Sequence, residues 1–113
     1  MPYDEKLASR IRQVLASQTA LGERKMFGGI AFMLGGNMCC GVAKDLLMVR
    51  VGPEGYEEAL AKPHARPMDF TGRPLKGFVF VCPAGSRTDE ALRIWVLKAV
   101  HFTSSLPLKT KAK

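Results

Sequence analysis

The sequence has few of the side chains from which catalytic and metal sites are usually built. It contains two histidines, His64 and His101, and three cysteines. The cysteines form neither a C-x-x-C motif nor a zinc half-site, and the spacing of the histidines completes no ligand set or catalytic triad. We therefore expect no metal, no cofactor and no catalytic residues, and we expect all three thiols to be reduced.

Long apolar runs and an N-terminal secretory signal are also absent from the sequence. A transmembrane helix needs about 20 apolar residues, and a secretory signal joins a basic stretch to an apolar one. The sequence therefore predicts a cytoplasmic protein with no membrane contact. Its 113 residues suit one domain, expected over residues 1–107, with a disordered basic tail at 108–113.

Acidic residues are scarce, because 10 Asp and Glu stand against 17 Lys and Arg, a formal net charge of +7. Such a field attracts nucleic acid or an acidic partner, and it also keeps a small protein soluble. Reading a base sequence requires an element that enters a groove of the duplex, and no predicted helix clearly offers one. We expect at most weak, non-specific DNA binding that falls steeply with salt.

The basic residues in the middle of the chain are candidates for contact with an anion or a partner. The four that we single out are Arg50, Arg66, Arg73 and Lys76. Asp69 is a single acid within this basic stretch, which favours a structural ion pair over a catalytic base.

Periodic apolar positions predict three helices. The first has a stripe of Leu7, Ile11, Val14 and Leu15, with Asp4 as its N-cap and Gly22 as its end. A short helix begins at Pro53. Ser86 or Thr88 caps the last helix, whose stripe contains Leu92, Trp95, Val96, Ala99 and Thr103.

Short apolar runs predict strands at 30–34, 38–42 and 46–51, joined by tight turns at 35–37 and 44–45. Residues 78–82 predict a further strand, and residues 68–70 a short edge strand. Gly28 and Gly29 lead into a strand, which indicates a bulge or a close approach of the backbone and not a phosphate loop. The resulting fold is α+β: helix, three strands, helix, two strands, helix, with a mainly antiparallel sheet.

Two of the predicted strands are apolar on both faces. Ile30 and Phe32 alternate with Ala31 and Met33, and the strand at 78–82 shows the same pattern. A strand of this kind needs cover on both sides. Either helices lie on both faces, or part of one face pairs with a second subunit, and we expect a homodimer formed through an exposed apolar part of the sheet. Strand alternation also predicts that Cys39 and Cys40 point to opposite faces.

Four segments resemble the TfoX/Sxy N-terminal domain family in order and spacing. They read KMFGGIAFM at 25–33, NMCCGV at 37–42, LMVRVG at 47–52 and RPMDFTGRPLKGFV at 66–79. The resemblance covers about residues 3–106. It implies a fold like that of secretion chaperones, with the order of helices and strands predicted above.

The resemblance also implies a role in transcription. Longer members of the family regulate natural competence together with a cyclic-AMP-responsive activator, and they carry a C-terminal domain that these 113 residues lack. The family offers no established catalytic residues to transfer. We therefore expect a non-enzymatic interaction module, accessory to transcription, with a protein partner. The alternative is a small-molecule-binding protein or enzyme that uses Cys39, Cys40 or Arg73.

Overall fold

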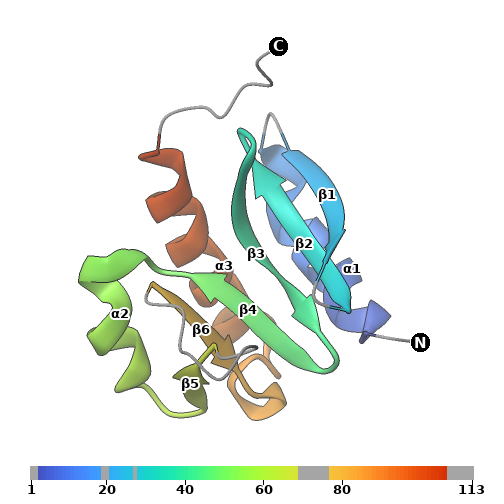
Figure 1. Cartoon of the computed structure of the whole chain (residues 1–113). Helices are drawn as coiled ribbons and strands as arrows, with labels where there is room; N and C mark the ends of the chain where they lie inside the picture. The colour runs from blue at the N-terminus through green and yellow to red at the C-terminus, as the bar shows by residue number, and fades with distance from the viewer. Residues whose placement is uncertain (1–2, 19–20, 27, 69–76, 107–113) are drawn as a thin grey trace.

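The computed structural model describes residues 3–18, 21–26, 28–68 and 77–106. It has three helices and a six-stranded antiparallel sheet, which confirms the α+β class (Figure 1). The elements are α1 (Glu5–Val14), β1 (Leu21–Met26), β2 (Gly29–Leu34), β3 (Asn37–Ala43), β4 (Leu46–Arg50), α2 (Gly52–Leu60), β5 (Ala65–Pro67), β6 (Phe78–Val81) and α3 (Asp89–Ser104). The strands lie in the order β1-β2-β3-β4-β6-β5. No helix in the described ranges is long and apolar enough to cross a membrane.

Side-chain caps begin the first and last helices, as the sequence predicts. The Asp4 carboxylate accepts a hydrogen bond from the Leu7 amide at 3.1 Å, and Thr88 accepts one from the Ala91 amide at 3.0 Å. Both bonds satisfy an amide that has no partner within its own helix. The predicted stripe of α3 is buried along its whole length.

Two tight turns join the central strands and confirm the predicted hairpins. Gly35 and Gly36 connect β2 to β3 with φ of 61° and 85°. Positive φ at both turn positions suits the twist of a hairpin, and glycine reaches it without steric cost. Lys44 and Asp45 connect β3 to β4.

The sheet has one strand more than the sequence predicts before α2. Helix α1 ends at Val14, a short 3₁₀ turn follows at Leu15–Ser17, and β1 then pairs with β2 along its whole length. The expected helix end at Gly22 is wrong, because that residue lies inside β1. The sequence hides β1 because residues 22–25 are exposed and mostly polar on an edge strand.

The second edge strand exists, but three residues earlier than predicted. It is β5, and its proline is tolerated because an edge strand leaves one side unpaired. Of the expected strand at 68–70, Met68 follows β5 as a buried residue outside any strand, and residues 69–70 lie outside the described ranges. The predicted domain boundary at 107 and the tail at 108–113 lie outside them as well.

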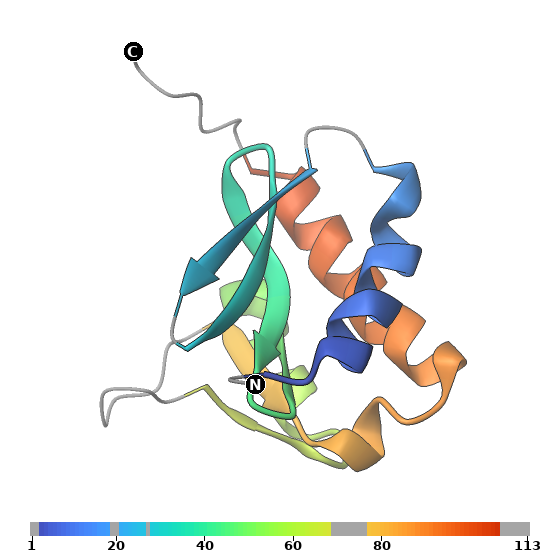
Figure 2. The ribbon, with the colours of Figure 1, turned by 90° about the vertical axis from the view of Figure 1, so that its right-hand side faces the viewer.

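Side chains from all three helices pack on one face of the sheet, against Ile30, Phe32, Val79 and their neighbours. Figure 2 shows α1 and α3 together on that side. On the opposite face, Met48 and Phe80 pack with Met68 in a second, smaller cluster that contains no helix residue. The alternation read from the sequence is therefore confirmed.

Cover for the second sheet face comes partly from within the chain, because Met68 is fully buried there. The described residues thus leave less exposed apolar surface on the sheet than the homodimer prediction assumes. Among the described residues, the exposed large apolar side chains are Ile94 and Leu97, and both belong to α3 rather than to the sheet. Dimerisation itself stays a prediction.

Candidate functional site

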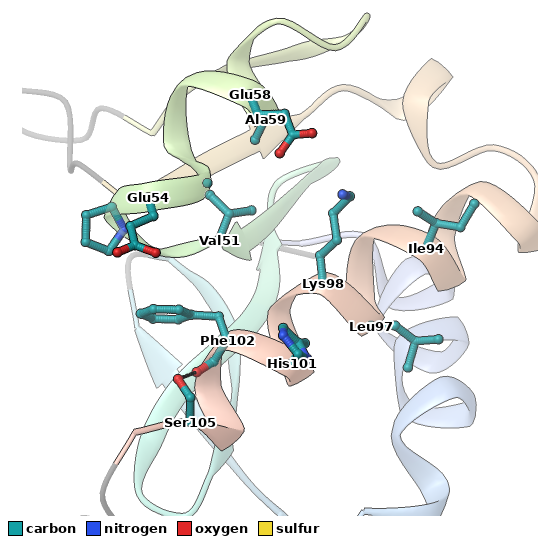
Figure 3. Close-up of a pocket in the computed structure, with 12 residues that line it drawn as sticks. Val51, Glu54, Glu58, Ala59, Ile94, Leu97, Lys98, His101, Phe102 and Ser105 are labelled. Atoms are coloured by element: carbon teal, nitrogen blue, oxygen red, sulfur yellow. Dashed lines mark hydrogen bonds between the residues drawn. The ribbon is translucent and has the colours of Figure 1, made fainter.

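A groove of about 890 Å³ runs between α2 and α3 (Figure 3). Its base is apolar and includes Val51, Ala59 and Phe102. The α2 wall carries Glu54 and Glu58. The α3 wall carries Ile94, Leu97, Lys98 and His101. Pro53, Gly55 and Ser105 complete the lining.

The start of α2 holds one end of the groove in place. The amides of Val51 and Gly52 both donate to the carbonyl oxygen of Gly77, at 2.7 and 3.0 Å. Gly52 has a φ of 85°, and a Cβ at that position would collide with the ring of Phe102. Only glycine therefore lets the chain turn into α2 this close to α3.

Charged side chains border the apolar base without pairing to one another. The ion pairs in the described part of the chain are Arg10–Asp89 and Arg12–Glu23, and neither touches the groove. Lys98 extends from α3 toward the side of α2 that carries Glu58 (Figure 3). These charges are thus available to an occupant of the groove.

The lining of the groove combines apolar, acidic and basic side chains with one serine. The hydroxyl of Ser105, the one serine in its lining, donates to the carbonyl oxygen of Phe102 at 2.6 Å and so serves the end of α3. In the described ranges no three His, Cys, Asp or Glu side chains gather closely enough to hold a metal ion. What the groove offers is exposed apolar surface with acids on one side and bases on the other.

Cys39 and Cys40 do not line the groove, and the prediction that they point to opposite faces is wrong. Phe32 pairs with Cys40 while Met33 pairs with Met38, so the register shifts and Cys39 is an extra residue in β3. Such a β-bulge interrupts the alternation of side chains. Both thiols therefore enter the core on the helix side, where both are fully buried.

The two thiols interact with each other. The hydrogen bond from Cys40 lowers the pKa of Cys39, with further help from the Thr103 hydroxyl and the positive charge of Arg50, while burial opposes the shift. The same bond, burial and the charge on Cys39 raise the pKa of Cys40. Because neither sulfur reaches the surface, this pair cannot serve the small-molecule site considered from the sequence.

Thiol accessibility gives a direct check of this placement. We expect brief maleimide labelling of the native, reduced protein to modify Cys82, which is only half-buried, before Cys39 and Cys40. Labelling of the buried pair requires local opening, so it should be roughly 100-fold slower or more. Mass spectrometry of the labelled peptides measures all three rates. Equal rates for the three cysteines would contradict the burial of the pair.

Two of the four basic candidates lie in the described ranges, and both contact an aromatic ring of β6. The guanidinium of Arg50 lies 5.1 Å from the centre of the Phe78 ring and 5.6 Å from that of Phe102, and it donates to the carbonyl oxygen of Met38. Arg66 lies 5.8 Å from the centre of the Phe80 ring. Arg50 therefore already has structural partners, whereas Arg66 is exposed. Arg73 and Lys76 lie outside the described residues.

The groove itself was missed from the sequence. The sequence feature that could have indicated it is in α3. Ile94 and Leu97 are apolar residues that lie outside the buried stripe of this helix, one helical turn apart. Of the two histidines, His101 lines the groove, while His64 lies in the turn before β5, where its carbonyl oxygen accepts from the Cys82 amide at 2.8 Å.

Comparison with known protein families gives a match over most of the chain. The model of the TfoX N-terminal domain matches residues 13–103, a span that includes only the end of α1 but contains α2, the whole sheet and nearly all of α3. It also contains every residue of the groove except Ser105. No curated protein and no solved structure matches the chain.

Proposed function

Since the chain belongs to the TfoX N-terminal domain family, we propose that it is a non-enzymatic protein-interaction module that assists transcription regulation, with the α2–α3 groove as its contact surface. The proposed role in transcription is based on the family resemblance, since the longer members of the family regulate natural competence. We extend that role to this chain. The interaction part is supported by the groove.

The observation that carries the proposal is the exposure of Ile94 and Leu97 beside an apolar groove. Their exposed fractions are 51% and 40%, whereas the other large apolar side chains in the described ranges are buried or half-buried. Apolar anchors one helical turn apart, next to a recess, are typical of surfaces that bind another protein. The groove lining also lacks a nucleophile paired with a base.

A second candidate function is binding of a small molecule in the same groove. Its volume of about 890 Å³ favours this reading, because ligand pockets usually measure about 300–1,000 Å³. The groove is open and formed by two helix surfaces, and neither Cys39 nor Cys40 contributes to it. For this reason we place it second.

We further propose that the isolated chain binds DNA weakly and without sequence preference. The net charge of +7 supplies attraction to phosphates, while Arg10, the most central base of α1, is already bonded to the carbonyl oxygens of Ser86 and Arg87. Neither α1 nor α3 presents a row of free polar side chains to read bases. Promoter choice would then come from a partner protein.

The test uses a strain from which the gene has been deleted, complemented with variants at equal protein abundance. We expect the deletion to change a defined set of transcripts, and the wild-type chain to restore it. Leu97→Asp places a charge on the groove and should fail to restore the set. Ser9→Asp adds the same charge on the exposed side of α1 and should restore it.

Two results would overturn the proposal. One is an unchanged transcript profile on deletion under every growth condition tried. The other is full restoration by Leu97→Asp. Circular dichroism and thermal unfolding of both purified variants show whether each keeps its fold.

A further inference from the structure

We propose that the groove is occupied by α3 of a second copy of this chain, in a two-fold symmetric homodimer. The inference rests on the proposed role of the groove as an interaction surface, and it names the partner. It differs from the dimer expected from the sequence, because the contact is made by helices α2 and α3 and not by the sheet.

The apolar side chains of α3 are suited to fill such a groove. Ile94 and Leu97 are spaced i and i+3, so they stand on the same side of the helix. Figure 3 shows both on α3 beside the recess, turned away from α2. In the monomer they face solvent, and in the dimer each would lie against Val51, Ala59 or Phe102 of the other copy. This is the geometry of helix-in-groove recognition.

Symmetry favours a second copy over an unrelated helix. A two-fold interface is self-complementary, so one surface must carry both the protruding and the receiving parts. Here the ridge of Ile94 and Leu97 directly adjoins the recess between α3 and α2. Each copy can therefore insert its Ile94 and Leu97 into the recess of the other copy. The dimer then buries both exposed apolar pairs.

The charges of α2 in one copy also complement those of α3 in the other copy. Helix α2 carries Glu54, Glu57 and Glu58 and has no lysine or arginine. Beyond its first turn, α3 carries Arg93, Lys98 and His101 and has no acid. An exchanged α3 therefore places these bases against the acids of α2, twice in the dimer, while the two acids of α3 lie in its first turn. This matters because two chains of net charge +7 repel each other over most of their surface.

Light scattering coupled to size-exclusion chromatography tests the oligomeric state of the full chain. We expect the wild-type protein and Ser9→Asp to have about twice the 12.4 kDa mass of one chain at micromolar concentration. Leu97→Asp should run as a single chain, with dimer affinity lower by roughly 100-fold or more. A wild-type mass of 12.4 kDa across a dilution series would overturn the inference.

Charge exchange gives a second test that does not depend on one variant. One double variant, Glu54→Lys with Glu58→Lys, makes the α2 wall basic. Another, Arg93→Glu with Lys98→Glu, makes α3 acidic. Each alone sets like charges against each other and should be monomeric. A mixture of the two restores opposite charges at both contacts, so it should form a heterodimer. A mixture that stays monomeric, or dimers in each variant alone, would overturn the inference.

The two proposals fail in different ways. If Leu97→Asp abolishes transcript restoration while the wild-type chain is monomeric, the groove binds another protein; the interaction function stands and the second copy is excluded. If the chain dimerises through the groove but Leu97→Asp restores transcription fully, the transcriptional function is excluded and the dimer stands.

Discussion

Replacing Gly29 with alanine is expected to destabilise the protein by about 3 kcal/mol or more. A Cβ at this position would collide with the carbonyl oxygen of Val42 and would lie 2.9 Å from the carbonyl carbon. The atoms in the way belong to the backbone of β3, which cannot move without breaking its pairing with β2. The sequence indicated a bulge or a close backbone approach here, and the structure shows the close approach.

Gly22→Ala is the matched control, since it makes the same change in the neighbouring strand. A Cβ there would meet nothing within 4 Å, so its effect should stay within about 0.5 kcal/mol. Urea unfolding measures both variants, with fluorescence of Trp95, the single tryptophan, as the signal. Equal chain concentrations are needed, because dimerisation would add to apparent stability. Comparable losses in the two variants would contradict the proposed collision.

The second large effect is expected for Phe32→Ala, which should cost about 3–5 kcal/mol. Phe32 is fully buried on the helix side of β2, and the Arg12 guanidinium lies 5.7 Å from the centre of its ring. The substitution leaves a cavity between the sheet and the helices. Domains of this size are stable by about 5–15 kcal/mol, so a large part of the total would be lost.

Met33→Ala is the control for this second prediction. Met33 is the next residue of the same strand, but it points to the other face and is only half-buried. Its loss should be about 1 kcal/mol, because less contact disappears. The same urea titration compares the two. A larger loss for Met33→Ala than for Phe32→Ala would reverse the assignment of the two faces.

Local signals in the sequence determined much of this fold. Asp4 and Thr88 cap their helices, and the spacing of apolar residues marks the buried sides of α1 and α3. Gly35 and Gly36 impose the turn between β2 and β3. In each case the interacting residues lie close together in the sequence. The residue pattern and local propensities are therefore enough to predict these features.

Contacts between distant segments decided the rest. Strand β1 has three charged residues among its six and forms because β2 lies beside it, not because of its own composition. The bulge at Cys39 comes from the register between β2 and β3, and it turns two adjacent thiols to the same side. Neither effect leaves a periodic signal in the chain.

The candidate site shows the same division. From the sequence alone, α3 is an amphipathic helix with two apolar residues off its stripe, and α2 is a short acidic helix. Their facing surfaces become a groove only because both helices pack on one side of the sheet and leave a gap between them. The separation of α2 and α3 is set by the close contact of Gly52 with Phe102 and by the strands on which both helices pack. The residue types of the site are thus determined by the sequence, while their arrangement around one recess exists only in the folded chain.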